Sequence, residues 1–168
     1  SHLLGVIGAR ACETDLKSFA EAHLLALLDT EVGFWQTDWE GNYLGHSDLH
    51  LTARDMAKFG LMVLDDGVYD GKQILPADWV HDCLQTCSED AWEFRVGRHW
   101  GAPGYGYQWR SIRAGDRRYA MARGHGGAQI ALVDDLDRVI VVSTDPLHGQ
   151  HGGQAWNLEK ENLNLVAD

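Results

Sequence analysis

The sequence predicts an α+β fold, in which an antiparallel sheet of about three to four strands packs with helices. Three observations support this class. Helical periodicity dominates the first half of the chain, strand-like runs with short connections fill residues 105–144, and an amphipathic helix follows at about 154–166. This order, with helices first, antiparallel strands next and one terminal helix, is typical of α+β proteins.

The first two helices are expected at residues 2–12 and 15–28. Asp15 is a suitable N-cap for the second of them. The apolar face of that helix is predicted from positions at helical spacing: Leu16, Phe19, Ala20, His23, Leu24 and Leu27. Residues 30–51 lose this periodicity and are rich in Gly, Asp and Trp, which predicts a long loop of the kind that is often functional.

A third helix is predicted from Thr52 to about Leu64, because Thr52 and Asp55 have the spacing of a capping box. Its buried face is expected to hold five residues: Met56, Phe59, Gly60, Met62 and Val63. Pro76 suits the first turn of a fourth helix, at about 77–87.

The three cysteines give no disulfide framework, so we expect buried free thiols at Cys12, Cys83 and Cys87. Cys83 and Cys87 lie four positions apart, which would place them on one face of the fourth helix. A zinc site at this pair is disfavoured because no second cysteine pair completes a set of ligands.

Four strand-like runs follow, at residues 105–112, 117–123, 128–134 and 138–144. Two of their connections are short enough for hairpins, so the runs predict an antiparallel meander. On the first strand, alternate positions would share one face: Tyr105, Tyr107 and Trp109. Core packing is the favoured interpretation of these aromatics, and a pocket wall is the alternative.

The composition is that of a folded globular protein, with 45% hydrophobic and 10% aromatic residues in 168 positions. The formal net charge of −11 argues against nucleic acid as a partner, because neutralising phosphates requires clustered Lys and Arg. No apolar run approaches the roughly 20 residues that span a bilayer. The chain opens without methionine and already inside a helical pattern, which is unusual for a natural domain, so we expect that either an upstream part was removed or the gene was cut.

The stretch that points most directly to a binding site is "RGHGGAQ", in which His125 lies among three glycines. Glycine lets a ligand approach the backbone closely, and the N–H of Ala128 is then a candidate donor to a developing oxyanion. His125 could polarise a substrate carboxylate. The alternative is a tight turn before a strand, with His125 at the surface.

Four stretches in this order resemble the C-terminal part of the serine β-lactamase and penicillin-binding-protein family, on its class C-like side with esterases, D-amino-acid peptidases and amide hydrolases. They are "SHLLGVIGARACETDLKSFAEAHL", "LTARDMAKFGLMVLDDGVYDGKQILPADWV", "GYGYQW" and "GHGGAQIALVDDLDRVIVVSTD". The resemblance implies a serine β-lactamase/transpeptidase-like fold and runs nearly end to end.

In that family a Ser-x-x-Lys turn supplies the nucleophile and a base, and a Tyr-x-Asn or similar element carries a second proton. A Lys-Thr-Gly or His-x-Gly element on an edge strand faces the substrate. The resemblance assigns the third element here to four substrate-binding residues: His125, Gly126, Gly127 and Ala128. It also places the strand of Tyr105, Tyr107 and Trp109 near the cleft, as a possible pocket wall.

The first two elements are missing from the sequence. The residues three positions before the four lysines are Thr14, Asp55, Tyr69 and Asn157, and no Tyr-x-Asn occurs. Covalent acyl transfer requires an activated nucleophile, so we expect no turnover of β-lactam, ester or amide substrates by this chain. Residues 1–168 are therefore predicted to form a single partial domain, without the part of the family that bears the nucleophile. The alternative is a non-catalytic binding or assembly module.

The expected partner is a small-molecule or peptide-like substrate, if the missing half completes the site, and no cofactor is expected. Two histidine pairs, His46 with His50 and His148 with His151, are interpreted as solvated loop residues rather than a metal site. The resemblance further implies that residues 138–144 lack a partner strand, which predicts a homo-oligomer formed through this sheet edge. Relatives are often exported, and the localisation of this chain stays open.

Overall fold

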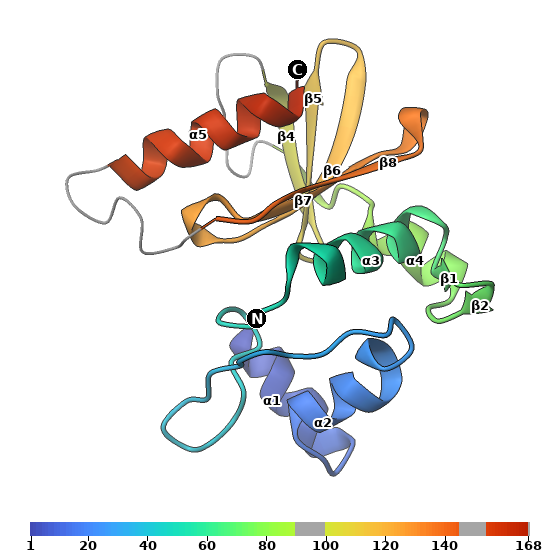
Figure 1. Ribbon diagram of the computed structural model, residues 1–168, viewed down its shortest axis with the longest axis vertical. Coiled ribbons are helices and arrows are strands. Elements are labelled where there is room, and N and C mark those ends of the chain that lie inside the picture. Colours follow the sequence, from blue (N-terminus) through green and yellow to red (C-terminus); the bar gives the residue numbers. More distant parts are fainter. Residues whose placement is uncertain (90–99, 145–153, 168) are drawn as a thin grey trace. The chain divides into compact units, whose positions relative to one another are not determined.

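The computed structural model describes residues 1–89, 100–144 and 154–167, and these form two compact units, Ser1–Lys58 and Phe59–Asp168. The first unit begins with helix α1 (His2–Ala11) and helix α2 (Leu16–Ala20) (Figure 1). Helix α2 continues into a π-helical segment, Glu21–Leu25. The Asp15 side chain accepts a hydrogen bond from the Ser18 N–H at 2.9 Å, which confirms Asp15 as a cap.

The rest of the first unit is the predicted irregular loop. Two isolated antiparallel bridges, Trp35 with Leu49 and Thr37 with Tyr43, bring its two arms together. The loop ends at Thr52, whose Oγ1 accepts from the Asp55 N–H at 3.2 Å and whose hydroxyl donates to the Asp55 carboxylate at 2.6 Å. This confirms the capping pair, and helix α3 (Ala53–Leu64) follows.

The second unit contains a six-stranded antiparallel sheet, so the sheet is larger than the three to four strands predicted. Its strands lie in sequence order, β3-β4-β5-β6-β7-β8. Their bounds are Ser88–Glu89, Gly101–Gly106, Trp109–Ala114, Arg117–Arg123, Gln129–Val133 and Arg138–Val142. The predicted α+β class and the meander are thus confirmed, and among the described residues β8 is the last strand of the sheet.

The prediction of one strand at 105–112 is wrong. Tyr107 and Gln108 form a tight turn between β4 and β5, with φ values of 47° and 75°. Gly106 pairs with Trp109 directly across this turn. Because Tyr105, Tyr107 and Trp109 lie before, within and after the turn, they do not share one face of one strand.

The two faces of the sheet are covered by different helices. On one face, helix α5 (Gln154–Ala167) packs Leu163 and Val166 against a buried cluster that includes Ile112 and Met121. On the other face, Gly60 of α3 lies against Val139 and Ile130, where an added Cβ would come within 2.5 Å of Val139. The sheet is therefore the middle layer of three (Figure 1).

A second, two-stranded sheet of β1 (Val68–Tyr69) and β2 (Lys72–Gln73) connects α3 to helix α4 (Ala77–Cys83). Helix α4 begins at Ala77, as predicted, and Pro76 lies at its N-cap rather than in its first turn. No helix in the described part of the chain is long and apolar enough to cross a membrane.

The cysteine predictions are corrected in two respects. Because α4 ends at Cys83, Cys87 lies beyond the helix and the two thiols do not share a helical face. All three cysteines are free, but Cys12 and Cys87 are exposed rather than buried. Burial raises the pKa of the half-buried Cys83 thiol above its usual range, and the nearby Asp82 adds to this effect.

Candidate functional site

The glycine-rich stretch forms a tight connection between β6 and β7. The Gly124 N–H donates to the Ala128 carbonyl oxygen at 2.8 Å and closes the turn. Gly126 and Gly127 have φ values of 83° and 93°, a region that residues with a side chain rarely adopt. The backbone path itself therefore requires glycine at these two positions.

The four residues assigned to substrate binding lie in this turn. His125 begins a short 3-10 segment, His125–Gly127, and the placement of its side chain lies outside what the structure describes. Gly126 and Ala128 are half-buried and Gly127 is buried. Ala128 is extended, with φ −61° and ψ 133°, and leads directly into β7.

Helix α5 holds the start of β7 in place through a residue that the sequence analysis did not single out. Gln129 is 1% exposed, and its Nε2 donates to the Asn162 carbonyl oxygen of α5 at 3.0 Å. The sequence did contain a sign of this role, because Gln129 is a polar residue at the start of an otherwise apolar strand. All five residues of that strand are buried.

The aromatic residues of the predicted pocket wall lie at the same end of the sheet as the glycine turn. Strands β5 and β6 are antiparallel, so Trp109 at the start of β5 and Arg123 at the end of β6 lie at one end. The Tyr107–Gln108 turn and the Gly124–Ala128 turn therefore both project from this end. The structure brings the two predicted groups to one edge, although not through the strand geometry expected.

Contacts with the helices fix these aromatic rings. The Trp109 ring stacks on Phe59 of α3, with centroids 6.3 Å apart and an interplanar angle of 5°. The Tyr107 ring meets Trp79 of α4 edge-on at 5.5 Å, and the Tyr105 hydroxyl donates to Gln108 Oε1 at 3.1 Å. Tyr107 is 55% exposed, so an aromatic surface is accessible beside the glycine turn.

This arrangement offers groups that could bind a ligand. Backbone N–H groups of the turn can donate to a carbonyl or carboxylate oxygen, and an aromatic surface can contact the apolar part of a ligand. The sequence supplies no Ser-x-x-Lys nucleophile for this edge.

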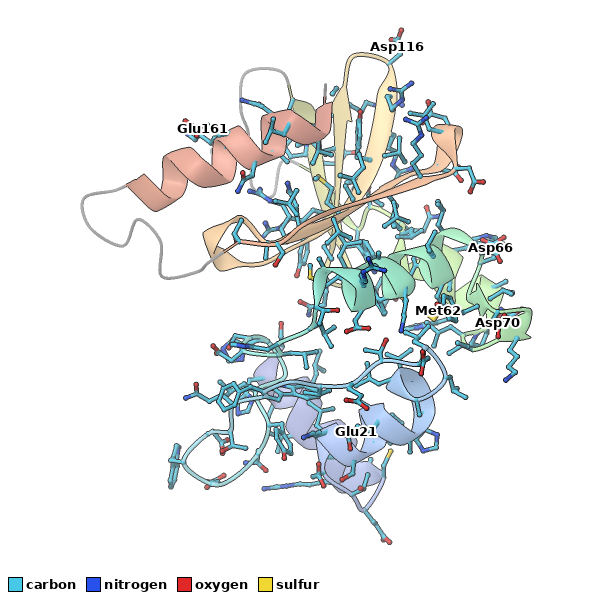
Figure 2. All side chains as sticks on the ribbon, viewed as in Figure 1. Glu21, Met62, Asp66, Asp70, Asp116 and Glu161 are labelled. Carbon is cyan, nitrogen blue, oxygen red and sulfur yellow. The ribbon has the colours of Figure 1, made fainter. Side chains whose placement is uncertain are left out.

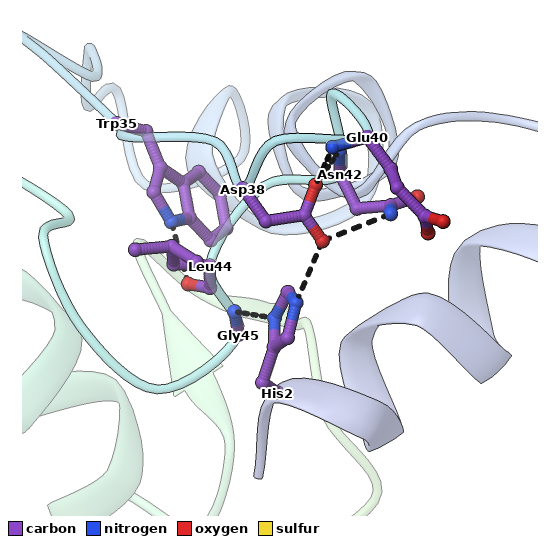
Figure 3. A network of polar contacts seen from close by, with 7 residues as sticks. All are labelled: His2, Trp35, Asp38, Glu40, Asn42, Leu44 and Gly45. Carbon is purple, nitrogen blue, oxygen red and sulfur yellow. Dashed lines mark hydrogen bonds and ion pairs between the residues drawn. The ribbon is translucent and has the colours of Figure 1, made fainter.

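The first unit contains a separate polar network around Asp38 (Figure 3). The Asp38 carboxylate accepts from the backbone N–H groups of Glu40 and Asn42, each at 2.9 Å, and from Asn42 Nδ2 at 3.0 Å. Gly45 N–H donates to His2 Nδ1, so His2 Nε2 is the donor to Asp38 at 3.0 Å. These bonds, with that of the Asn42 side chain foremost, lower the pKa of Asp38 to about 2.

Metal binding gains no support in the described part of the chain, where no group of three His, Cys, Asp or Glu residues could hold an ion. His46 and His50 are exposed, as expected for solvated loop residues. His148 and His151 lie outside the described residues.

Comparison with solved structures identifies a likeness in fold. No family model matches the sequence. Among solved structures, the chain is similar to a protein described as "Putative 6-aminohexanoate-dimer hydrolase from Bacillus anthracis", with a TM-score of 0.65 and 22% sequence identity. The likeness covers 98% of this chain and 41% of that chain, so this chain spans less than half the length of the other protein.

Proposed function

We propose that this chain, which has the fold of the C-terminal part of a serine β-lactamase-like hydrolase, forms the substrate-facing portion of such an enzyme. The observation that carries the proposal is the fold likeness, which extends over 98% of the chain. It runs through both compact units, and for this reason we treat residues 1–168 as one partial domain.

The substrate would bind at the end of the sheet where the two turns project. In the proposed roles, His125 interacts with a substrate carboxylate or hydrogen-bonds a proton carrier, and the Ala128 N–H donates to a developing oxyanion. Gly126 and Gly127 keep the turn compact, and the exposed Tyr107 ring and the half-buried Trp109 ring form one wall. The similar solved protein is described as a hydrolase of the 6-aminohexanoate dimer. Two amino acids of this kind join through an amide, so a linear amide is the first substrate class to test.

The chain alone would bind without turning over its substrate. Hydrolysis through an acyl-enzyme requires a serine and an adjacent base, and no lysine of the sequence follows a serine at the required spacing. The activity would therefore depend on a segment that bears the nucleophile and lies outside these 168 residues.

Three measurements test this proposal: hydrolysis by the chain alone, labelling by a serine-directed probe, and the activity of a longer reading frame. The chain alone is expected to hydrolyse nitrocefin and p-nitrophenyl acetate no faster than buffer, and a fluorophosphonate probe should leave it unlabelled. Heat-sensitive hydrolysis, or stoichiometric labelling, would contradict the proposal. A longer reading frame carrying Ser-x-x-Lys should be active, and His125→Ala within it should lower kcat/KM by at least tenfold.

A second candidate function is a non-catalytic assembly module. It is favoured by the position of β8, which has a neighbour on one side only within the described sheet. The residues of β8 between Arg138 and its end are Val139, Ile140, Val141 and Val142, which carry no charge to discourage pairing with another strand. We propose that two copies associate by antiparallel pairing of their β8 edges and that nucleic acid is not a partner.

A further inference from the structure

A cavity of about 390 Å³ lies in the second unit, at the end of the sheet opposite the glycine turn. It borders the last part of β5 and the first part of β6, close to the hairpin whose tip is Asp116 (Figure 2). This volume is within the range of small-molecule sites. The charged residues among its described lining are Glu89, Arg113 and Arg118.

The strand register explains why these residues share the cavity. Arg113 pairs directly with Arg118, and directly opposed residues of antiparallel strands project from the same face. Ser111 lies two positions before Arg113 and is therefore on this face too, opposite Gly104. Gly104 in turn pairs with Glu89 of β3, which extends the same face to the edge of the sheet.

The two arginines are an unfavourable pair unless an anion lies between them. Like charges placed directly opposite each other on adjacent strands destabilise a sheet. Arg113 Nη1 donates to the Asp116 carbonyl at 3.4 Å, and Arg118 Nη2 donates to the Leu84 carbonyl at 3.2 Å. Both acceptors are neutral, and in the described portion of the chain neither guanidinium has a carboxylate within 4.0 Å.

Hydroxyl groups complete a polar lining beside the arginines. Thr86 Oγ1 and Ser111 Oγ are 2.7 Å apart, and Arg118 Nη2 donates to Thr86 Oγ1 at 3.5 Å. The absence of a side chain at Gly104 makes this possible, because an added Cβ would lie 2.5 Å from Ser111 Oγ and 2.4 Å from the Thr86 methyl group. Gly104 thus leaves room for these two hydroxyl groups in the lining.

We propose that this cavity is a binding site for a small monocarboxylate, with Arg113 and Arg118 as its carboxylate ligands. The planar guanidinium matches a carboxylate in a two-bond geometry, and each arginine has N–H donors beyond those that contact the carbonyls. With Glu89, the described part of the lining carries a net charge of +1, which balances one negative charge and disfavours a phosphate dianion. The site is independent of the glycine turn and of the hydrolase proposal.

Titration of the ¹⁵N-labelled chain with sodium butyrate tests the site through the arginine Nε–Hε resonances. Sodium chloride at the same ionic strength and sodium phosphate at pH 7 serve as reference titrations. Butyrate should shift the resonances of Arg113 and Arg118 saturably, whereas chloride should not. Arg113→Gln and Arg118→Gln should each weaken the apparent Kd for butyrate at least tenfold.

Arg117→Gln is the matched control, because Arg117 neighbours Arg118 in sequence but forms an ion pair with Asp135 at 2.8 Å and lies on the other face. It should bind butyrate as the unmodified chain does. Shifts that chloride reproduces, equal weakening by Arg117→Gln, or tighter binding of phosphate than of butyrate would each overturn the proposal. Far-UV circular dichroism of each variant should show that these substitutions leave the fold intact.

Discussion

Gln129 of β7 and Asn162 of α5 are joined by a hydrogen bond of 3.0 Å from the Gln129 side chain to the helix backbone. Gln129 follows the Gly124–Ala128 turn directly and is almost fully buried. Helix α5 therefore contacts β7 at its first residue, Gln129, which directly follows Ala128 with the proposed oxyanion donor. We therefore expect order at the glycine turn to depend on the packing of α5 against the sheet.

Gln129→Ala is expected to lower the free energy of unfolding by about 2 kcal/mol, because it removes the bond and leaves a cavity under α5. Gln129→Leu fills the same volume and removes the buried Oε1, which has no partner in the described structure. We expect Leu to change stability by less than about 1 kcal/mol. Urea unfolding of the two variants would separate the contribution of packing from that of the hydrogen bond. Equal losses in the free energy of unfolding for Ala and Leu would contradict this account.

Two glycines of the turn, Gly124 and Gly126, differ in backbone conformation and can be compared by substitution with alanine. Gly126→Ala is expected to cost about 1–2 kcal/mol, because its φ of 83° disfavours any side chain. Gly124 has φ −101°, and an added Cβ would be 3.7 Å from its nearest neighbours. Gly124→Ala should therefore leave the urea midpoint nearly unchanged. If both substitutions cost the same, the backbone conformation of this turn is not the reason for its glycines.

Asp38 should make the first unit sensitive to acid. Hydrogen bonds, led by that from Asn42, lower the pKa of Asp38 from 3.8 to about 2 in the folded state. The unfolded state then binds the proton more readily, so the stabilisation is present above about pH 4 and is lost as pH falls through 2. The stability difference between the unmodified chain and Asp38→Asn should stay constant above pH 5 and shrink below pH 4. Glu40→Gln, at an exposed neighbour, leaves the Asp38 carboxylate in place and should retain the acid sensitivity of the unmodified chain.

Blocking the β8 edge should prevent self-association. Val141 is half-buried near the middle of β8, and Val141→Lys would place a charge on the edge that we propose pairs with a second copy. Light scattering should show dimers of the unmodified chain and monomers of this variant. Leu136→Lys adds the same charge in the neighbouring turn and should remain dimeric. A monomeric unmodified chain at high concentration would contradict edge pairing.

The helix predicted at residues 15–28 shows which features the sequence pattern could predict and which it could not. The pattern correctly predicted the helix and its cap, and its apolar face included Leu24 and Leu27. In the structure the buried residues are Leu25 and Leu28, while Leu27 is 45% exposed. The π-helical segment Glu21–Leu25 adds one residue to a turn and shifts the buried face by one position. A search with the α-helical period alone cannot detect such a shift.

The candidate site was predicted in part. The glycine pattern located a special turn, and the order of the strands followed from the short connections. The division of residues 105–112 into two strands was missed because Tyr-Gln is not a recognisable turn sequence. Gln129 was missed because its partner, Asn162, is 33 positions away and could be located only from the fold.

The Tyr107–Gln108 turn has a consequence for the order in which the sheet folds. Tight hairpin turns with two positive φ angles favour Asn and Gly, which adopt them in short peptides, whereas Tyr and Gln do not. The β5–β6 connection, by contrast, contains Gly115 at φ 59°. We therefore expect β5, β6 and β7 to pair first, with turns that are preset by their own residues. Strand β4 would pair last. Pairing with β5 and the contact of Tyr107 with Trp79 would then offset the backbone strain of the Tyr107–Gln108 turn.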